Sequence, residues 1–162
     1  MGMWSKTIIN GDSALDRLDE ISIVIGFEYP DTDNDDERDA YEAAFPFKEK
    51  LEKFEDAVGY ALRGLDVSSN EYNCHIRYMS MGYLFMKYGA KISTKWKKMI
   101  LDEAKNDSWA KVDEERNYYI QDFIQKLKMY DNQSPIDIET IGLFDAMMEH
   151  DGKGLLNQEI SK

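Results

Sequence analysis

The three- and four-residue spacing of apolar side chains most constrains what this chain can fold into. The clearest example is a run of apolar residues at this spacing: Phe47, Leu51, Phe54, Val58 and Leu62. Such spacing puts the side chains on one face of an α-helix, whereas a half-buried strand would need alternation. We therefore predict an all-α protein. Residues 1–152 are expected to form a single compact domain of six or seven helices, and residues 153–162 a flexible C-terminal tail.

Capping residues, glycines and prolines divide this pattern into segments. The predicted helices cover residues 12–26, 35–44, 46–64, 68–88, 94–104, 108–132 and 139–150. The β-branched run 21–25 would also suit a short strand, although we favour a helix. The segment 74–86 is apolar on more than one face, which predicts a central, buried helix.

Acidic side chains are abundant and unevenly placed. The chain has 32 acidic and 20 basic residues, a formal net charge of -12. Residues 12–56 hold sixteen acids and five bases, whereas residues 87–105 hold six lysines and two acids. A strongly negative field repels nucleic-acid phosphates and attracts basic protein surfaces. We expect no direct nucleic-acid binding; the plainer interpretation is that the acids keep the protein soluble.

Known catalytic patterns are missing from the sequence. It contains no G-x-S-x-G, H-E-x-x-H, P-loop or G-x-G-x-x-G motif. The only cysteine, Cys74, is followed by His75, and neighbouring helical residues diverge too far to form a nucleophile–base pair. We predict a protein that is not an enzyme and needs no cofactor. A small hydrolase using Cys74 with His150 stays open as an alternative.

The segment 31–42 is the sharpest local pattern. Its acids fall at positions 1, 3, 5, 9 and 12 of a twelve-residue window, which is the ligand spacing of a calcium-binding EF-hand loop. Asp36, however, stands where that loop needs glycine, and Arg38 where an aliphatic residue belongs. We favour an acid-rich helix N-terminus and predict no metal ligands. A regulator that responds to divalent metal ions remains an alternative.

The segment 91–98 combines four lysines with Trp96. Such a mixture could bind phosphate or an acidic partner, and it could also receive the acidic third of a second copy. A homo-oligomer is thus possible. We favour a solvated helix face from which Trp96 points inward.

The N-terminal segment resembles a known family. Trp4, Ile8, Asp12, Ala14 and Asp16 match the opening W-G-x-G-[IVL]-F-x-N-D-x-A-x-D of the domain of unknown function 4259 family. The two glycines, the aromatic residue and the asparagine of that pattern are replaced by Ser5, Thr7, Ile9 and Gly11. A later tryptophan followed by an arginine seven residues on, here Trp109 and Arg116, is similar to a second family feature. The resemblance implies a small, acidic, helical, intracellular protein of bacterial or phage type and supplies no reaction.

These features together predict a non-enzymatic acidic protein that occupies a basic surface of a protein partner, as an inhibitor, immunity or anti-defence factor does. The partner could be a nucleic-acid-binding enzyme. The predicted partner-binding residues are Asp31, Asp33, Asp35, Asp36, Glu37, Asp39 and Glu42. No run approaches the roughly 18 apolar residues of a membrane span, and the N-terminus lacks the features of a signal peptide. We therefore expect a cytoplasmic protein with no membrane partner.

Overall fold

The protein is seen here in a computed structural model that describes residues 12–64 and 77–138. These residues form seven α-helices and no strand, which confirms the predicted all-α class. The helices are α1 (Asp12–Ile25), α2 (Asp35–Ala44), α3 (Phe47–Lys53), α4 (Glu55–Arg63), α5 (Arg77–Tyr88), α6 (Thr94–Lys105) and α7 (Glu114–Met129).

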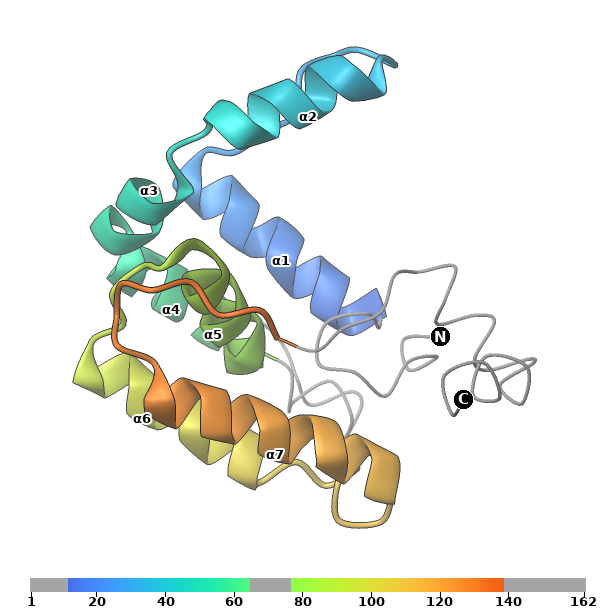
Figure 1. Cartoon of the computed structure of the whole chain (residues 1–162), viewed down its shortest axis with the longest axis vertical. Helices are drawn as coiled ribbons and strands as arrows, with labels where there is room; N and C mark the ends of the chain where they lie inside the picture. The colour runs from blue at the N-terminus through green and yellow to red at the C-terminus, as the bar shows by residue number, and fades with distance from the viewer. Residues whose placement is uncertain (1–11, 65–76, 139–162) are drawn as a thin grey trace, which may run out of the picture.

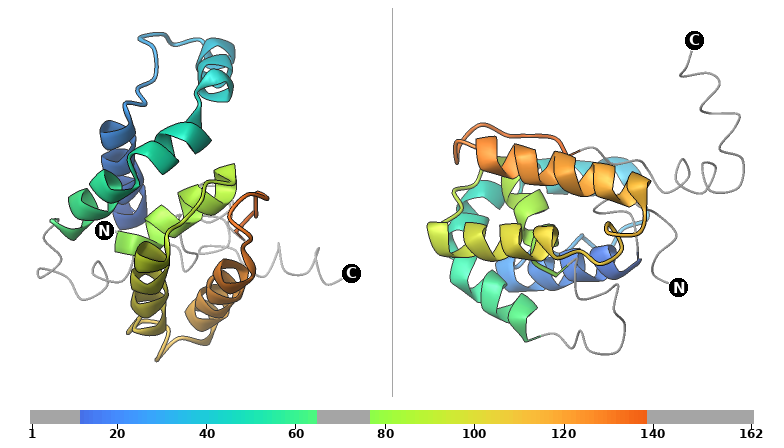
Figure 2. Two further views of the ribbon diagram at one scale, coloured as in Figure 1. Left: turned by 90° about the vertical axis from the view of Figure 1, so that its left-hand side faces the viewer. Right: turned by 90° about the horizontal axis from the view of Figure 1, so that it is seen from below.

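Helix α5 lies at the centre of the described helices, as its apolar sequence predicts. It packs against α1, α3, α4 and α6, and α7 packs in turn on α6 (Figure 1). Large side chains of α5 such as Met79, Met81 and Phe85 are fully buried. Figure 2 shows α6 and α7 running side by side in opposite directions. A helix surrounded on several sides must be apolar around most of its circumference, and α5 is.

Helix α1 resolves the ambiguity of the β-branched run 21–25 in favour of a helix. Ile21 and Ile25, one helical turn apart, are both buried against the core. Gly26 follows at a φ of 79°, the left-handed conformation that commonly ends a helix and that glycine adopts without strain.

The prediction of a single helix over residues 46–64 is wrong in one respect. The chain unwinds locally at Phe54, which has φ -106° and ψ 22° and separates α3 from α4. Its N–H still donates to Lys50 O at 3.0 Å, and its carbonyl still accepts from Val58 N at 2.9 Å. The apolar period therefore continues across the break. The bend lets α3 pack on α5 while α4 packs on both α1 and α5.

The helix predicted over residues 108–132 is also shorter than expected. Helix α7 begins at Glu114, with Asp113 as its N-cap accepting from Arg116 N. Residues 108–112 form turns instead, within which the Asp107 carboxylate accepts from Ala110 N at 2.8 Å. Val112, which lies in these turns, is 82% exposed.

Several expectations fall outside the described residues. These are the N-terminal segment around Trp4, the first part of the helix predicted over 68–88, the helix predicted over 139–150 and the tail 153–162. Cys74, His75 and His150, on which the hydrolase alternative depends, also fall outside them.

Candidate functional site

The predicted partner-binding residues all lie on one projecting segment. This segment, which we call the acidic arm, comprises residues 28–44 and holds the loop before α2 together with α2 itself. Figure 1 shows α2 at the edge of the molecule farthest from α6 and α7. Helix α2 buries none of its residues. With eight acids and one arginine, the acidic arm is the most negative part of the described chain.

The first turn of α2 is held by local hydrogen bonds. Asn34 is the N-cap, and its side chain accepts from Glu37 N at 3.1 Å. Thr32 Oγ1 accepts from Asn34 N at 3.1 Å and donates to Glu37 Oε2 at 2.8 Å. Carboxylates in the first turn, here from Asp35 to Glu37, also interact favourably with the positive end of the helix dipole. Part of the acidity is therefore explained by helix formation.

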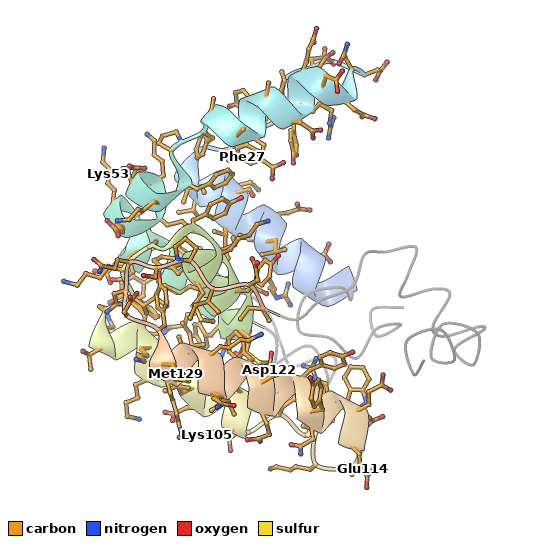
Figure 3. The ribbon with its side chains drawn as sticks, in the orientation of Figure 1. Phe27, Lys53, Lys105, Glu114, Asp122 and Met129 are labelled. Carbon is orange, nitrogen blue, oxygen red and sulfur yellow. The ribbon has the colours of Figure 1, made fainter. Side chains whose placement is uncertain are left out.

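Aromatic contacts attach the acidic arm to the helical body. Phe27 stands at its base (Figure 3) and contacts Tyr41, Phe45 and Phe47, with ring centroids 5.6, 5.1 and 4.8 Å away. Tyr29 also packs on Phe27, at 4.9 Å. These contacts give the arm a defined position even though α2 has no fully buried residue.

Polar groups near the base reinforce this attachment. Tyr29 Oη donates to Glu42 Oε2 at 3.0 Å, and the Arg38 guanidinium lies 4.3 Å from the Tyr29 ring centroid. Partial burial raises the pKa of Tyr29 above its usual value, and the hydrogen bond to Glu42 raises it further. The phenol thus stays protonated and remains a donor at neutral pH.

The acidic arm leaves most of its carboxylates free. Asp31, Asp33, Asp35, Asp36, Glu37 and Asp39 are exposed, and Glu42 is half-buried. No salt bridge within residues 12–64 and 77–138 uses any of these seven side chains. Helical spacing puts Asp35, Asp39 and Glu42 on one face and Asp36 on the next. The structure therefore brings the seven residues onto one projection without gathering them on a single face.

The calcium-like window lies in the same segment. Its residues from Asp35 to Glu42 are helical, so most of it is not a loop, and the acid-rich helix N-terminus that we favoured is confirmed. Across the two described ranges, no group of three histidine, cysteine or acidic side chains is placed to hold a metal ion.

The basic strip 91–98 has the predicted arrangement. Trp96 is fully buried, and its Nε1 donates to Asp56 Oδ1 at 2.7 Å. Lys95 lies over the Tyr60 ring, 4.6 Å from its centroid, and Lys98 pairs with Asp102 at 2.8 Å. The tryptophan therefore belongs to the core and is closed to a ligand, while these lysines have intramolecular partners.

A hollow at the base of the acidic arm was missed by sequence reasoning. It has a volume of about 550 Å³ and lies where the end of α2, the start of α3 and the end of α5 meet. Two of its wall residues, Lys87 and Tyr88, are remote in sequence from the arm. The run Phe45-Pro46-Phe47 was the available signal, because it places two aromatic rings beside a helix break.

Comparison with protein-family models, with curated proteins and with solved structures yields no match. These comparisons supply no independent function, and the N-terminal resemblance stays a prediction. No helix in the described ranges is both long enough and apolar enough to span a membrane.

Proposed function

We propose that this chain is a non-enzymatic interaction protein that places its acidic arm on a basic surface of a protein partner. The observation that carries the proposal is the exposure of six carboxylates, none in a salt bridge within the described ranges, on a segment that projects from the helical body. A nucleic-acid-binding cleft, for instance that of a nuclease, presents the kind of surface such a segment would fit. The chain would then act as an inhibitor, immunity or anti-defence factor.

Electrostatics supports this assignment in two ways. Acidic side chains that only confer solubility can be spread over a surface, whereas here eight of them fall within the seventeen residues 28–44. A projecting cluster of one sign steers association with a surface of the opposite sign and raises the association rate at low ionic strength. The aromatic base, including Phe27 and Phe45, would hold these charges in place before binding and so limit the entropy lost on association.

The test is affinity capture from nuclease-treated lysate of the native source, followed by elution in a salt gradient. The arm variant carries Asp33→Asn, Asp35→Asn, Asp36→Asn and Glu37→Gln. The control variant removes the same number of charges from exposed positions outside the arm: Asp16→Asn, Asp19→Asn, Glu114→Gln and Asp137→Asn.

We expect a basic protein that moderate salt releases from the wild-type chain and from the control, and that the arm variant fails to retain. The captured protein would then be purified, and its binding or inhibition measured directly with the same three chains. Equal retention by the arm variant and the wild type, or a complex that salt does not weaken, would contradict the proposal.

A further inference from the structure

The hollow at the base of the acidic arm has an aromatic wall. The rings of Phe47 and Tyr88 are stacked, with centroids 4.3 Å apart and planes 10° from parallel. Phe45 packs on Phe47 with its centroid 4.7 Å away. Tyr88 and Phe45 are only half-buried, so they keep ring surface that a partner's side chain can cover.

Carboxylates stand beside these rings. Asp39 and Glu42 enter the hollow from α2, and Glu49 enters from α3. Asp39 and Glu49 are exposed and take part in no salt bridge in the described ranges. Glu42 is close enough to Tyr88 that its charge adds to the effect of burial, which raises the pKa of Tyr88 to about 12. The Tyr88 phenol is thus uncharged at physiological pH.

Two lysines also line the hollow, and neither is paired with its carboxylates. Lys48 donates to Glu52 Oε2 at 3.3 Å, which lies outside the hollow. Lys87 Nζ lies 5.5 Å from the Tyr88 centroid and 5.8 Å from that of Tyr83. Lys87 is exposed and forms no salt bridge within residues 12–64 and 77–138. Its position indicates that the Tyr88 ring attracts a cation.

We propose that this hollow receives an arginine side chain from the basic partner. The inference rests on the proposed function and names the side chain of the partner that binds in the hollow. A guanidinium is planar, stacks on aromatic rings and gives two parallel N–H donors to a carboxylate. Tyr88 and Phe45 supply the ring surface, and Asp39 and Glu49 supply the acceptors. Lys87 moves aside when the guanidinium enters.

A charge-neutral substitution tests the hollow itself. Ala43 lines the hollow, whereas Ala40 lies on α2 outside it, and both are exposed. Ala43→Phe would fill the space, and Ala40→Phe adds the same bulk to the same helix. The probe is a fluorescein-labelled hexa-arginine peptide, and binding is followed by fluorescence anisotropy with the full chain at near-physiological salt. Circular dichroism of each variant checks that its helix content is unchanged.

We expect Ala43→Phe to weaken binding about tenfold, a loss typical of a single buried anchor, and Ala40→Phe to leave it unchanged. A second pair of variants guards against misfolding by Ala43→Phe. Asp39→Asn with Glu49→Gln should weaken binding about tenfold, and Asp31→Asn with Asp33→Asn, which removes equal charge, only two- to threefold or so. A hexa-lysine peptide should bind the wild type more weakly than hexa-arginine, because an ammonium cannot stack.

The outcomes separate this inference from the proposed function. If the two acid pairs weaken binding equally, or the two alanine variants bind alike while the acid pairs still weaken binding, the hollow is not the anchor, although the acidic arm still binds basic chains. If every variant binds as the wild type does, the inference and the acidic-arm proposal both fail.

Discussion

The guanidinium of Arg116 and the carboxylate of Asp107 form a buried ion pair at 2.7 Å, in which each side chain is only 1% exposed. Arg116 belongs to the first turn of α7, and Asp107 follows the end of α6. The Arg116 guanidinium also lies 5.0 Å from the Trp109 ring centroid. The pair therefore determines how the chain turns between these two helices, with Trp109 closing over it.

Asp107→Ala should destabilise the protein by about 3–5 kcal/mol, because it removes the carboxylate that is paired with the buried Arg116 guanidinium. Replacing both partners, as in Asp107→Leu with Arg116→Met, should cost less than Asp107→Ala alone. Urea unfolding followed by circular dichroism gives these free energies. Asp102→Ala provides the control, since its pair with Lys98 is exposed and screened by solvent and should contribute little to stability. A similar cost for Asp107→Ala and Asp102→Ala would show that burial of the first pair has no energetic consequence.

Glu103 should make stability fall as the pH rises. Burial raises its pKa from the usual 4.5 to about 8, although it accepts hydrogen bonds from Tyr78 N and Met79 N, and Arg77 lies 3.9 Å away. Between pH 4.5 and about 8, Glu103 holds its proton in the folded state but has lost it in the unfolded state. The free energy of unfolding contributed by this group is therefore greatest below pH 4.5 or so and declines as the pH approaches about 8.

The check is a series of urea titrations across this pH range for the wild type and Glu103→Gln. The difference between the two chains isolates Glu103 from the repulsion among the other acids. We expect the wild type to lose on the order of a few kcal/mol relative to the variant between pH 5 and 8. Parallel pH profiles would mean that Glu103 is ionised throughout.

Gly59→Ala should be strongly destabilising. A Cβ at this position of α4 would overlap the six-membered ring of Trp96, which is fully buried and tied to Asp56 by its indole N–H. Because neither ring nor helix can shift freely, we expect a loss of about 1–3 kcal/mol or more. Gly64→Ala is the matched control: its nearest neighbours would be 3.6 and 3.7 Å away, so a thermal melt should show little change.

Phe27→Ala should loosen the acidic arm without unfolding the body. Phe27 is half-buried and contacts four other aromatic rings at the base of the arm, so its removal deletes the centre of that cluster. Hydrogen exchange followed by mass spectrometry should show faster exchange in residues 28–44 and unchanged protection in α5. Uniform acceleration across both segments would instead assign Phe27 a role in the whole core.

The helical segments were readable from sequence wherever the apolar pattern itself specifies a helix. The stripe of α1 and the all-round apolar surface of α5 are such cases. The two wrong boundaries arose where tertiary contacts compete with local pattern. Asp107 holds Ala110 N and Arg116 at the same time, and this arrangement turns a segment that periodicity alone continues as helix.

The candidate site also has one part that could be predicted from sequence and one part that could not. The acidic segment that carries the seven predicted residues was readable from sequence, because charge within a short segment needs no distant partner; their role in binding stays a prediction. The hollow was not found, because Tyr88 lies about forty residues from Phe47, and only the packing of α5 against α3 stacks their rings. Period, caps and charge are local properties, so the sequence by itself determined the helical class and the acidic segment. How far that segment projects, and what lies at its base, depended on contacts between residues distant in the chain, which only the tertiary structure decides.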